Sequence, residues 1–270
     1  MPRRARWAGQ FYPGDAAALA SEVDRLLAAW PPAPAGEAEP WALLVPHAGY
    51  PYSGLTAAAA FARLPAGVAR VVLLGPSHHQ PVQGFALSEA DAWETPLGDM
   101  AVDTAAVAEL LAAGRPFRRD DMAMSMEHSL EVQLPFLRRL RPGAVLLPVL
   151  MGWADAGERE AARKALGELA RPGDLWVVTT DLSHYHPRDE AERLDSEAER
   201  LIAAGDAAGF AAALAGGRLE ACGAGPVQLL LEESAARGGR ATVLDRRDSG
   251  DGSGVTSEVV GYLAATFHAA

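Results

Sequence analysis

Short apolar runs alternate with helical segments along most of this chain, and this alternation restricts its fold more than any other feature. The runs Trp41–Val45, Arg70–Leu74, Val145–Leu150 and Leu175–Thr179 have the length and aliphatic content of buried strands. Strands that alternate with helices build layered folds around a largely parallel sheet. We therefore predict one layered α/β domain over residues 1–270, with a mostly parallel or mixed central sheet flanked by helices.

The remaining elements follow from spacing and from turn residues. Helices are expected at 15–29, 54–64, 103–113, 129–140, 154–170, 188–204, 207–214 and 225–236, and further strands at 85–88, 241–244 and 257–264. Pro148 predicts that its strand lies at a sheet edge or is irregular there, because proline cannot donate to a strand ladder. The stretch 250–254, GDGSG, is expected to be a flexible turn, since it lacks the strand and helix of a dinucleotide-binding loop.

Composition excludes several classes of partner. The 270-residue chain has a formal net charge of −11, whereas nucleic-acid-binding surfaces are basic. Cys222 is the only cysteine, so an intrachain disulfide cannot form, and this count is typical of a reducing compartment. The basic N-terminus precedes no apolar signal region, and no apolar run approaches the roughly 20 residues of a membrane span. We expect a cytoplasmic protein that binds neither nucleic acid nor membrane.

Histidines collect where the predicted strands end. Five of the seven histidines lie in the turns after three of these strands. His47 follows the run 41–45, His78 and His79 follow the run 70–74, and His184 and His186 follow the run 175–179. In open α/β sheets, ligands bind just outside the carboxyl ends of the strands. One such histidine would be an ordinary polar loop residue, but the joint clustering favours a functional site.

This set of residue types is typical of a transition-metal site. Imidazoles and one anionic donor on rigid strand ends hold an ion while other positions stay open for substrate. We predict His47 and His78 as ligands, with Cys222 or a carboxylate as the third. Cys222 precedes a predicted helix, a location that is expected to lower the pKa of its thiol. The alternative is that this lone cysteine is a small buried apolar residue.

The turn that begins at Asp181 carries candidate catalytic residues. His184 is predicted as a general base and Asp181 as the carboxylate that fixes its tautomer. Alternatively, Asp181 only caps a turn or helix. His186, which precedes a proline, is expected to be exposed, and His268 is expected to have no role.

A further acidic and histidine-containing stretch lies before the helix predicted at 129–140. Two interpretations are open for Glu127, His128 and Glu131: they orient metal ligands through hydrogen bonds, or they only form the start of a capped helix. The role of His79 is also open. The chain has no GxSxG elbow, P-loop or HExxH motif. Ser77 beside His78 does not favour a serine hydrolase, because adjacent turn residues rarely face each other.

An ordered set of motifs resembles the Memo family, whose prokaryotic members are called AmmeMemoRadiSam system protein B. The motifs are AGQFYP at 8–13, PHAGY at 46–50 followed by Tyr52, GPSHH at 75–79, TPLGD at 95–99, EHSLEVQLPFL at 127–137, LLPVL at 146–150, TDLSHY at 180–185 and CGxxP at 222–226. Each motif alone is weak, but the ordered set is specific and spans nearly the whole chain. It implies one Memo-like domain over residues 1–270.

The resemblance implies a fold similar to that of class III extradiol ring-cleavage dioxygenases, which are non-haem Fe(II) enzymes. Carried over by motif, the metal ligands would be His47, His78 and Cys222, with Asp181 and His184 in the same pocket and His184 at the position of the catalytic base. Those dioxygenases use a carboxylate where this chain has Cys222. A thiolate favours softer or redox-active metals, so copper is an alternative to Fe(II). The family name also implies AMMECR-type and radical SAM proteins as partners.

Three functions are therefore open. The first is an oxidoreductase with an Fe(II) site that acts on a small aromatic or catechol-like substrate. The second is a non-catalytic metal- or partner-binding module of a radical SAM-associated system. The third is a zinc hydrolase on the same ligands. Cys222 favours the module, because a thiolate in an oxygen-handling site is prone to oxidation, whereas Asp181 and His184 favour catalysis, because a pure binding site needs no base.

Overall fold

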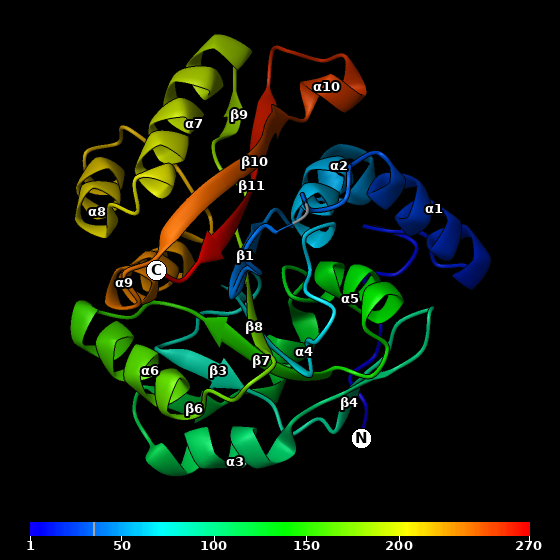
Figure 1. Cartoon of the computed structure of the whole chain (residues 1–270), viewed down its shortest axis with the longest axis vertical. Coiled ribbons are helices and arrows are strands. Elements are labelled where there is room, and N and C mark those ends of the chain that lie inside the picture. The colour runs from blue at the N-terminus through cyan, green and yellow to red at the C-terminus, as the bar shows by residue number, and fades with distance from the viewer. Residues whose placement is uncertain (35) are drawn as a thin grey trace.

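The computed structural model describes residues 1–34 and 36–270, and it confirms the predicted α/β class with a mixed central sheet (Figure 1). The nine strands of this sheet are β1 (Ala42–Val45), β2 (Arg70–Pro76), β3 (Phe85–Leu87), β6 (Phe117–Arg119), β7 (Val145–Met151), β8 (Asp174–Thr179), β9 (His184–His186), β10 (Arg240–Asp248) and β11 (Val259–His268). Their order is β10-β11-β1-β8-β2-β7-β3-β6, and β9 pairs with β11. A separate ribbon joins β4 (Ala92–Trp93) and β5 (Met100–Ala101).

The middle of the sheet is parallel and its flanks contain antiparallel pairs. β8 lies between β1 and β2 and runs parallel to both, so that Val178 pairs with Leu44 on one side and with Leu74 on the other. β11 is antiparallel to β1 and β10, and β3 is antiparallel to β7. The central strands are buried along nearly their whole length, which accounts for their continuous apolar sequences. The carboxyl ends of β1, β2 and β8 consequently meet at one edge of the sheet.

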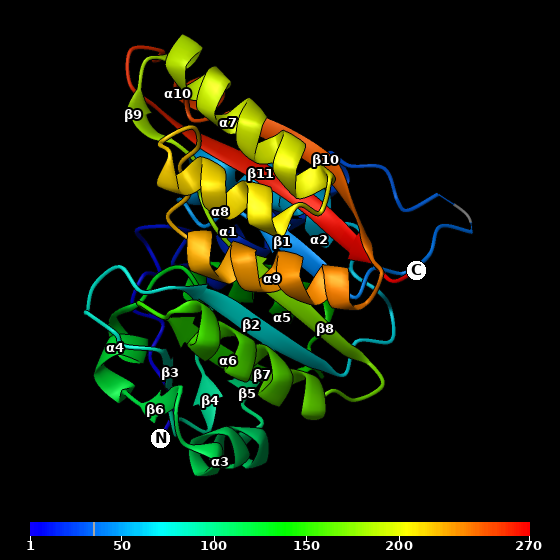
Figure 2. The same ribbon diagram turned by 90° about the vertical axis from the view of Figure 1, so that its left-hand side faces the viewer.

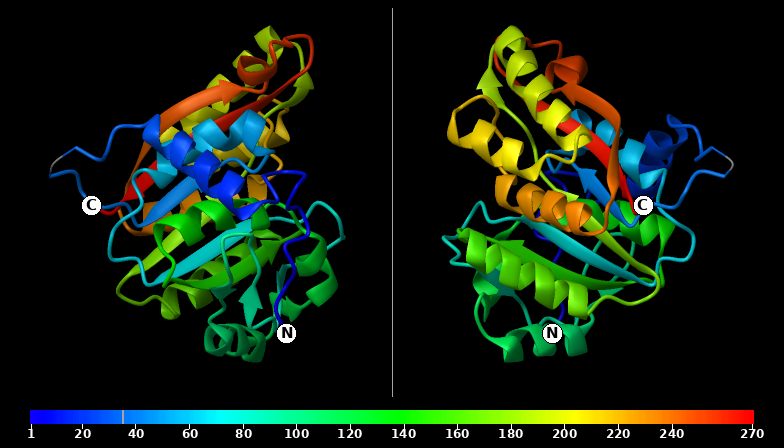
Figure 3. Two further views of the ribbon diagram at one scale, coloured as in Figure 1. Left: turned by 90° about the vertical axis from the view of Figure 1, so that its right-hand side faces the viewer. Right: turned by 60° about the vertical axis from the view of Figure 1, so that its left-hand side comes forward.

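Helices cover both faces of the sheet. They are α1 (Ala16–Ala28), α2 (Tyr50–Phe61), α3 (Thr104–Ala113), α4 (Asp121–Met126), α5 (Leu134–Leu140), α6 (Ala156–Glu168), α7 (Arg188–Ala203), α8 (Ala207–Ala215), α9 (Ala224–Ala236) and α10 (Gly250–Ser253), with the 3₁₀ turn η1 (Glu131–Gln133) before α5. A row of α6, α9, α8 and α7 lies on one face (Figure 2), and α1, α2 and α5 lie on the other (Figure 3). Within the described ranges, no helix is long and apolar enough to cross a membrane.

Three predicted elements differ from the structure for local reasons. The helix expected at 54–64 begins at Tyr50, because Pro51 is well tolerated in a first helical turn. The helix expected at 129–140 is divided into η1 and α5, and Pro135 stands at the start of α5, where proline again fits. The turn expected at 250–254 is the short helix α10, which ends at Gly254 with φ of 75°.

Pro148 lies in β7, which is an interior strand rather than an edge strand. β2 pairs with β7 along its whole length, but β3 pairs only with Leu150 and Met151. The side of β7 that faces β3 therefore has no ladder partner at Pro148, and the missing N–H of proline leaves no unpaired acceptor in a neighbouring strand. The expected edge position is wrong, and the pairing of β7 with β2 continues through Pro148 without a register shift.

A buried carboxylate fixes the loop after β8. Asp195 on α7 is 2% exposed, and its Oδ1 accepts a hydrogen bond of 3.0 Å from the backbone N–H of Ser183. Gly261 on β11 lies against it, since a Cβ atom there would come 1.8 Å from Asp195 Oδ2. Burial raises the pKa of Asp195 to about 6.

We expect Asp195 to make the protein less stable as pH rises from about 4 to about 6. In this window the folded chain holds a proton on Asp195 that the unfolded chain has released, so the free energy of unfolding falls with rising pH, by up to about 3 kcal/mol. Asp195→Asn should remove this contribution to the pH dependence of the free energy of unfolding. Urea unfolding of both proteins at several pH values measures this dependence. The same change of unfolding free energy with pH in both proteins would contradict the raised pKa of Asp195.

Candidate metal centre

The strand ends bring most of the predicted site residues together. His47 follows β1, His78 follows β2 and Asp181 follows β8, while Cys222 comes from the turn before α9. The rings of His47 and His78 have centroids 5.0 Å apart, and Cys222 Sγ lies 3.1 Å from His47 Nε2. Residues 175 positions apart in the sequence therefore meet because of the parallel sheet and the packing of α9 against β2 and β8.

The ring of His47 is buried and held through one nitrogen. Its Nδ1 lies 2.8 Å from Thr179 Oγ1, and Gln133 Nε2 donates to the same hydroxyl oxygen at 3.2 Å. A neutral His47 that donates from Nδ1 keeps the lone pair of Nε2 free. That atom faces Cys222. Burial, and then the neighbouring His78, lower the pKa of His47 well below its usual value, which favours the neutral form that binds metals.

A buried glutamate holds His78 in the same way. Glu127 is fully buried, and its two oxygens accept from His78 Nδ1 at 2.8 Å and from the His78 backbone N–H at 2.7 Å. Burial alone would raise the pKa of Glu127, but the hydrogen bond and charge of His78 lower it below its ordinary range. The Nε2 atom of His78 is again left free. Glu127 therefore orients the His78 ring, and its Oε1 also accepts from the backbone N–H of Ser129, so both roles left open by the sequence are compatible with its contacts.

His128 belongs to the same cluster, although the sequence pattern did not identify it as a ligand. One ring nitrogen from each of His47, His78 and His128 lies within 4.8 Å of the others. Burial, and then His47, lower the pKa of His128 to about 3, so its ring is also neutral at pH 7. Its position directly after Glu127 was the only available signal, and such adjacency does not indicate where a side chain points.

Cys222 has an environment different from the one predicted. Its sulfur accepts a hydrogen bond of 3.2 Å from the Asp181 backbone N–H, but burial, and then the charge of Asp181, raise the pKa of the thiol to about 12. The prediction of a lowered pKa is wrong, because desolvation outweighs the nearby helix. Gly223 allows the turn to approach β8: a Cβ atom there would lie 2.4 Å from the carbonyl oxygen of Thr179.

Asp181 and His184 are not partners. Asp181 Oδ1 accepts a hydrogen bond of 2.8 Å from the His47 backbone N–H, and Asp181 Oδ2 lies 3.9 Å from His47 Nε2. His184 Nδ1 instead donates to the carbonyl oxygen of Leu182 at 2.7 Å, which leaves Nε2 free to accept a proton. The prediction that Asp181 fixes the tautomer of His184 is wrong, because residues 181 and 184 point to different neighbours. Burial raises the pKa of Asp181 to about 6.

Glu131 has a structural role that sequence reasoning did not identify. It is fully buried, and it accepts hydrogen bonds from Arg3, from the backbone N–H of Trp7 and from the hydroxyl of Tyr12. This carboxylate thereby fixes the N-terminal segment next to Glu127 and His128. Its four-residue spacing from Glu127 gives no hint of this, because the donors lie more than 100 positions away in the sequence.

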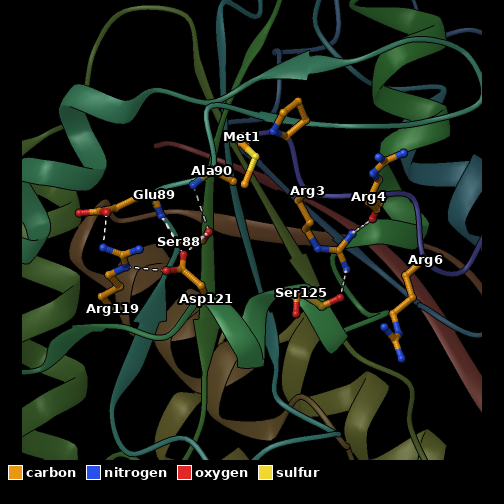
Figure 4. Close-up of a pocket in the computed structure, with 11 residues that line it drawn as sticks. Met1, Arg3, Arg4, Arg6, Ser88, Glu89, Ala90, Arg119, Asp121 and Ser125 are labelled. Carbon is orange, nitrogen blue, oxygen red and sulfur yellow. Dashed lines mark hydrogen bonds and ion pairs between the residues drawn. The ribbon is translucent and has the colours of Figure 1, made fainter.

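His186 and His268 have partners outside this cluster. His186 is half-buried, not fully exposed as expected, because its Nε2 lies 3.0 Å from Glu220 Oε1. His268 is buried in β11 and contacts Thr266 Oγ1. A cavity of about 640 Å³ beside the N-terminus, lined by Arg3, Arg119 and other charged residues, contains none of the candidate ligands (Figure 4).

Comparison with known proteins gives a consistent assignment. The fold and the site define an α/β protein with a cluster of candidate metal ligands at its strand ends. Residues 3–266 match the model of the Memo family, described as "Memo-like protein". A "MEMO1 family protein" of Aquifex aeolicus is 36% identical and one of Methanosarcina acetivorans is 35% identical, and the alignments cover 95–96% of this chain and 96–97% of those proteins. The chain belongs to the Memo family.

A solved structure is also similar. The crystal structure of an uncharacterized protein from Escherichia coli K12 aligns with a TM-score of 0.48 and 12% sequence identity. The alignment covers 83% of this chain and 98% of that one.

Removing the charge that orients His78 should weaken metal binding. Glu127→Gln keeps the side-chain volume but replaces the carboxylate oxygens that accept from His78, so we expect metal affinity to fall about 10- to 100-fold. Competition titration with a chelator measures it. The control is Glu220→Gln, which alters a more exposed glutamate–histidine pair at His186 and should leave affinity unchanged. Equal affinities in the three proteins would contradict the role of Glu127.

Proposed function

We propose that this protein binds Fe(II) through His47 Nε2, His78 Nε2 and Cys222 Sγ and acts as an oxidoreductase on a small aromatic substrate. One observation carries the proposal. The Nδ1 atoms of both histidines are engaged, by Thr179 Oγ1 and by Glu127, which leaves both Nε2 atoms available, and His47 Nε2 lies 3.1 Å from Cys222 Sγ. Ligating histidines in metalloproteins are typically oriented in this way by a hydrogen bond at the other ring nitrogen.

The chemistry of the donor set fits such an ion. Imidazole suits iron, copper and zinc, and a thiolate favours the softer and redox-active members of this group. Copper and zinc are therefore the alternatives to Fe(II). The thiol must lose its proton to bind, so the ion competes with the proton that burial holds on Cys222. Asp181 Oδ2, 3.9 Å from His47 Nε2, is the nearest carboxylate that could replace the thiolate.

The residues around the donors have distinct tasks. A bound redox-active ion would supply electron transfer and polarise a coordinated hydroxyl group. His184, whose Nδ1–H donates a hydrogen bond to the carbonyl oxygen of Leu182, can accept a proton from a substrate hydroxyl at Nε2. Asp181 holds the backbone of His47 and keeps the turn after β1 in place. Three protein donors leave further coordination positions for the substrate.

A non-catalytic metal-binding module is the second candidate, and His128 favours it. A fourth donor from the same cluster would give three imidazoles and one thiolate, and four protein ligands are typical of closed structural sites. The thiolate would also be vulnerable in oxygen chemistry. As such a module, the protein would supply the ion to AMMECR-type or radical SAM partners or bind them through the surface around the ion, in accord with the name of the family's prokaryotic members.

Metal content tests the ligand set. Protein purified without oxygen should contain a stoichiometric amount of iron or copper by elemental mass spectrometry, and His47→Ala and Cys222→Ala should lose it. His186→Ala, which changes a histidine outside the cluster, should retain it. Retention in Cys222→Ala would exclude the thiolate as a required ligand and favour Asp181, and the absence of metal from all forms after reconstitution would overturn both candidates.

Turnover distinguishes the enzyme from the module. The loaded protein is screened with catechols and dioxygen, the oxidant whose atoms enter the cleaved ring, beside His184→Gln, which should keep the metal and lose about 10²- to 10⁴-fold in rate as expected for a lost general base. Cleavage that does not depend on His184 would contradict its role. A loaded protein that turns over no catechol would reject ring cleavage and favour the module.

A further inference from the structure

A second pair of histidines, His79 and His128, lies next to the buried ring of His47, and His79 is exposed to solvent. His79 Nε2 and His128 Nδ1 are 3.1 Å apart, and one ligand atom from each of His79, His128 and Glu127 lies within 4.8 Å of the others. A single ion bonded to both nitrogens at about 2.0–2.1 Å each requires a separation of this order. The two candidate groups in this region share His128.

Exposure changes in steps along these rings. His79 is exposed, the His128 side chain is 14% exposed and the His47 side chain is 2% exposed, whereas the His78 side chain is itself 26% exposed. Ring centroids are 5.2 Å apart from His79 to His128 and 5.5 Å from His128 to His47. The rings of His79, His128 and His47 therefore form a continuous path from solvent to the buried His47.

The outer pair is held in place by its neighbours. The ring of His79 stacks on Trp7, with centroids 5.1 Å apart and planes 22° apart, and His128 packs against Phe11 at 4.8 Å. Glu127 Oε1 lies 3.3 Å from His128 Nδ1 and supplies a negative charge. That oxygen already accepts hydrogen bonds from His78 and Ser129, so it attracts a cation rather than providing a free ligand position.

We propose that His79 and His128 form a docking site that captures a divalent transition-metal ion from solvent and passes it to His47, His78 and Cys222. The inference rests on the proposed function, because it requires His47, His78 and Cys222 to bind metal. Capture replaces the proton shared between His79 Nε2 and His128 Nδ1 with the ion, and that proton goes to water. Transfer then exchanges these nitrogens for the inner donors, and the thiol releases its proton as sulfur binds.

The kinetics of Co(II) loading test the docking step. Apo-protein is mixed anaerobically with Co(II), and the sulfur-to-cobalt charge-transfer band reports arrival at Cys222. A docking equilibrium predicts a wild-type loading rate that saturates as Co(II) concentration rises. His79→Gln keeps a hydrogen-bonding group beside His128 but removes the imidazole ligand. It should load at a rate that is linear in Co(II) and about tenfold slower at low concentration, because the local concentration of captured ion is lost.

The final intensity of the sulfur-to-cobalt band and a control variant distinguish a docking step from damage to the inner site. His79→Gln should reach the same final band intensity as the wild type, since His79 does not belong to the inner group. His186→Gln, a change at another solvent-accessible histidine, should load like the wild type. Saturating wild-type kinetics in His79→Gln would overturn the docking site alone, whereas a wild-type protein without any sulfur band would overturn the proposed function and the docking site together.

Discussion

The parallel pairing of β1, β8 and β2 is the constraint on which the site depends. Val178 in β8 is flanked by Leu44 and Leu74 at the same level of the sheet, so the three strands end together. Their C-terminal turns deliver His47, His78 and Asp181 to one edge. A change of direction in any of these strands would move its polar residue to the opposite edge. The apolar strands thus determine the positions of the polar residues that follow them.

Buried polar groups then determine how those residues point. Thr179 and Glu127 each engage the Nδ1 atom of one histidine, and Gln133 donates to Thr179 from behind. An isolated carboxylate as deeply buried as Glu127 would be costly, so the donors that surround it are required for the fold as well as for the site. Glu131, on the same segment, attaches the N-terminal segment through an equally buried carboxylate. The stability of this region and the geometry of the candidate centre therefore have the same origin.

Much of the fold could be predicted from the sequence because its signals are local. Continuous apolar runs such as Val71–Leu74 identified the central strands, and the turn residues that followed them indicated where a site would lie. The same reasoning gave His47, His78 and Cys222 as candidate ligands, and the structure places His47 beside His78 and beside Cys222. Short elements such as β9 and α10 were missed or read as turns, since their few residues are stabilised by tertiary contacts rather than by a sequence period.

The orientation of side chains could not be predicted in this way. Asp181 and His184 are three residues apart, yet one contacts the His47 backbone and the other the carbonyl of Leu182. His128 belongs with His47 and His78 only because Glu127 and the N-terminal segment position it. The pKa of Cys222 depends on how deeply the turn is buried, and a motif contains no information about burial. Such properties arise from contacts between segments that are distant in the chain.

The central claim is that His47, His78 and Cys222 hold one transition-metal ion. X-ray absorption at the metal edge, on protein loaded with Fe(II) without oxygen, tests it most directly, because the first shell distinguishes sulfur from nitrogen and oxygen scatterers. Our account predicts one sulfur and at least two imidazole nitrogens in that shell, with the sulfur absent in Cys222→Ser. A wild-type shell of nitrogen and oxygen alone would contradict the account and assign the third position to a carboxylate or to water.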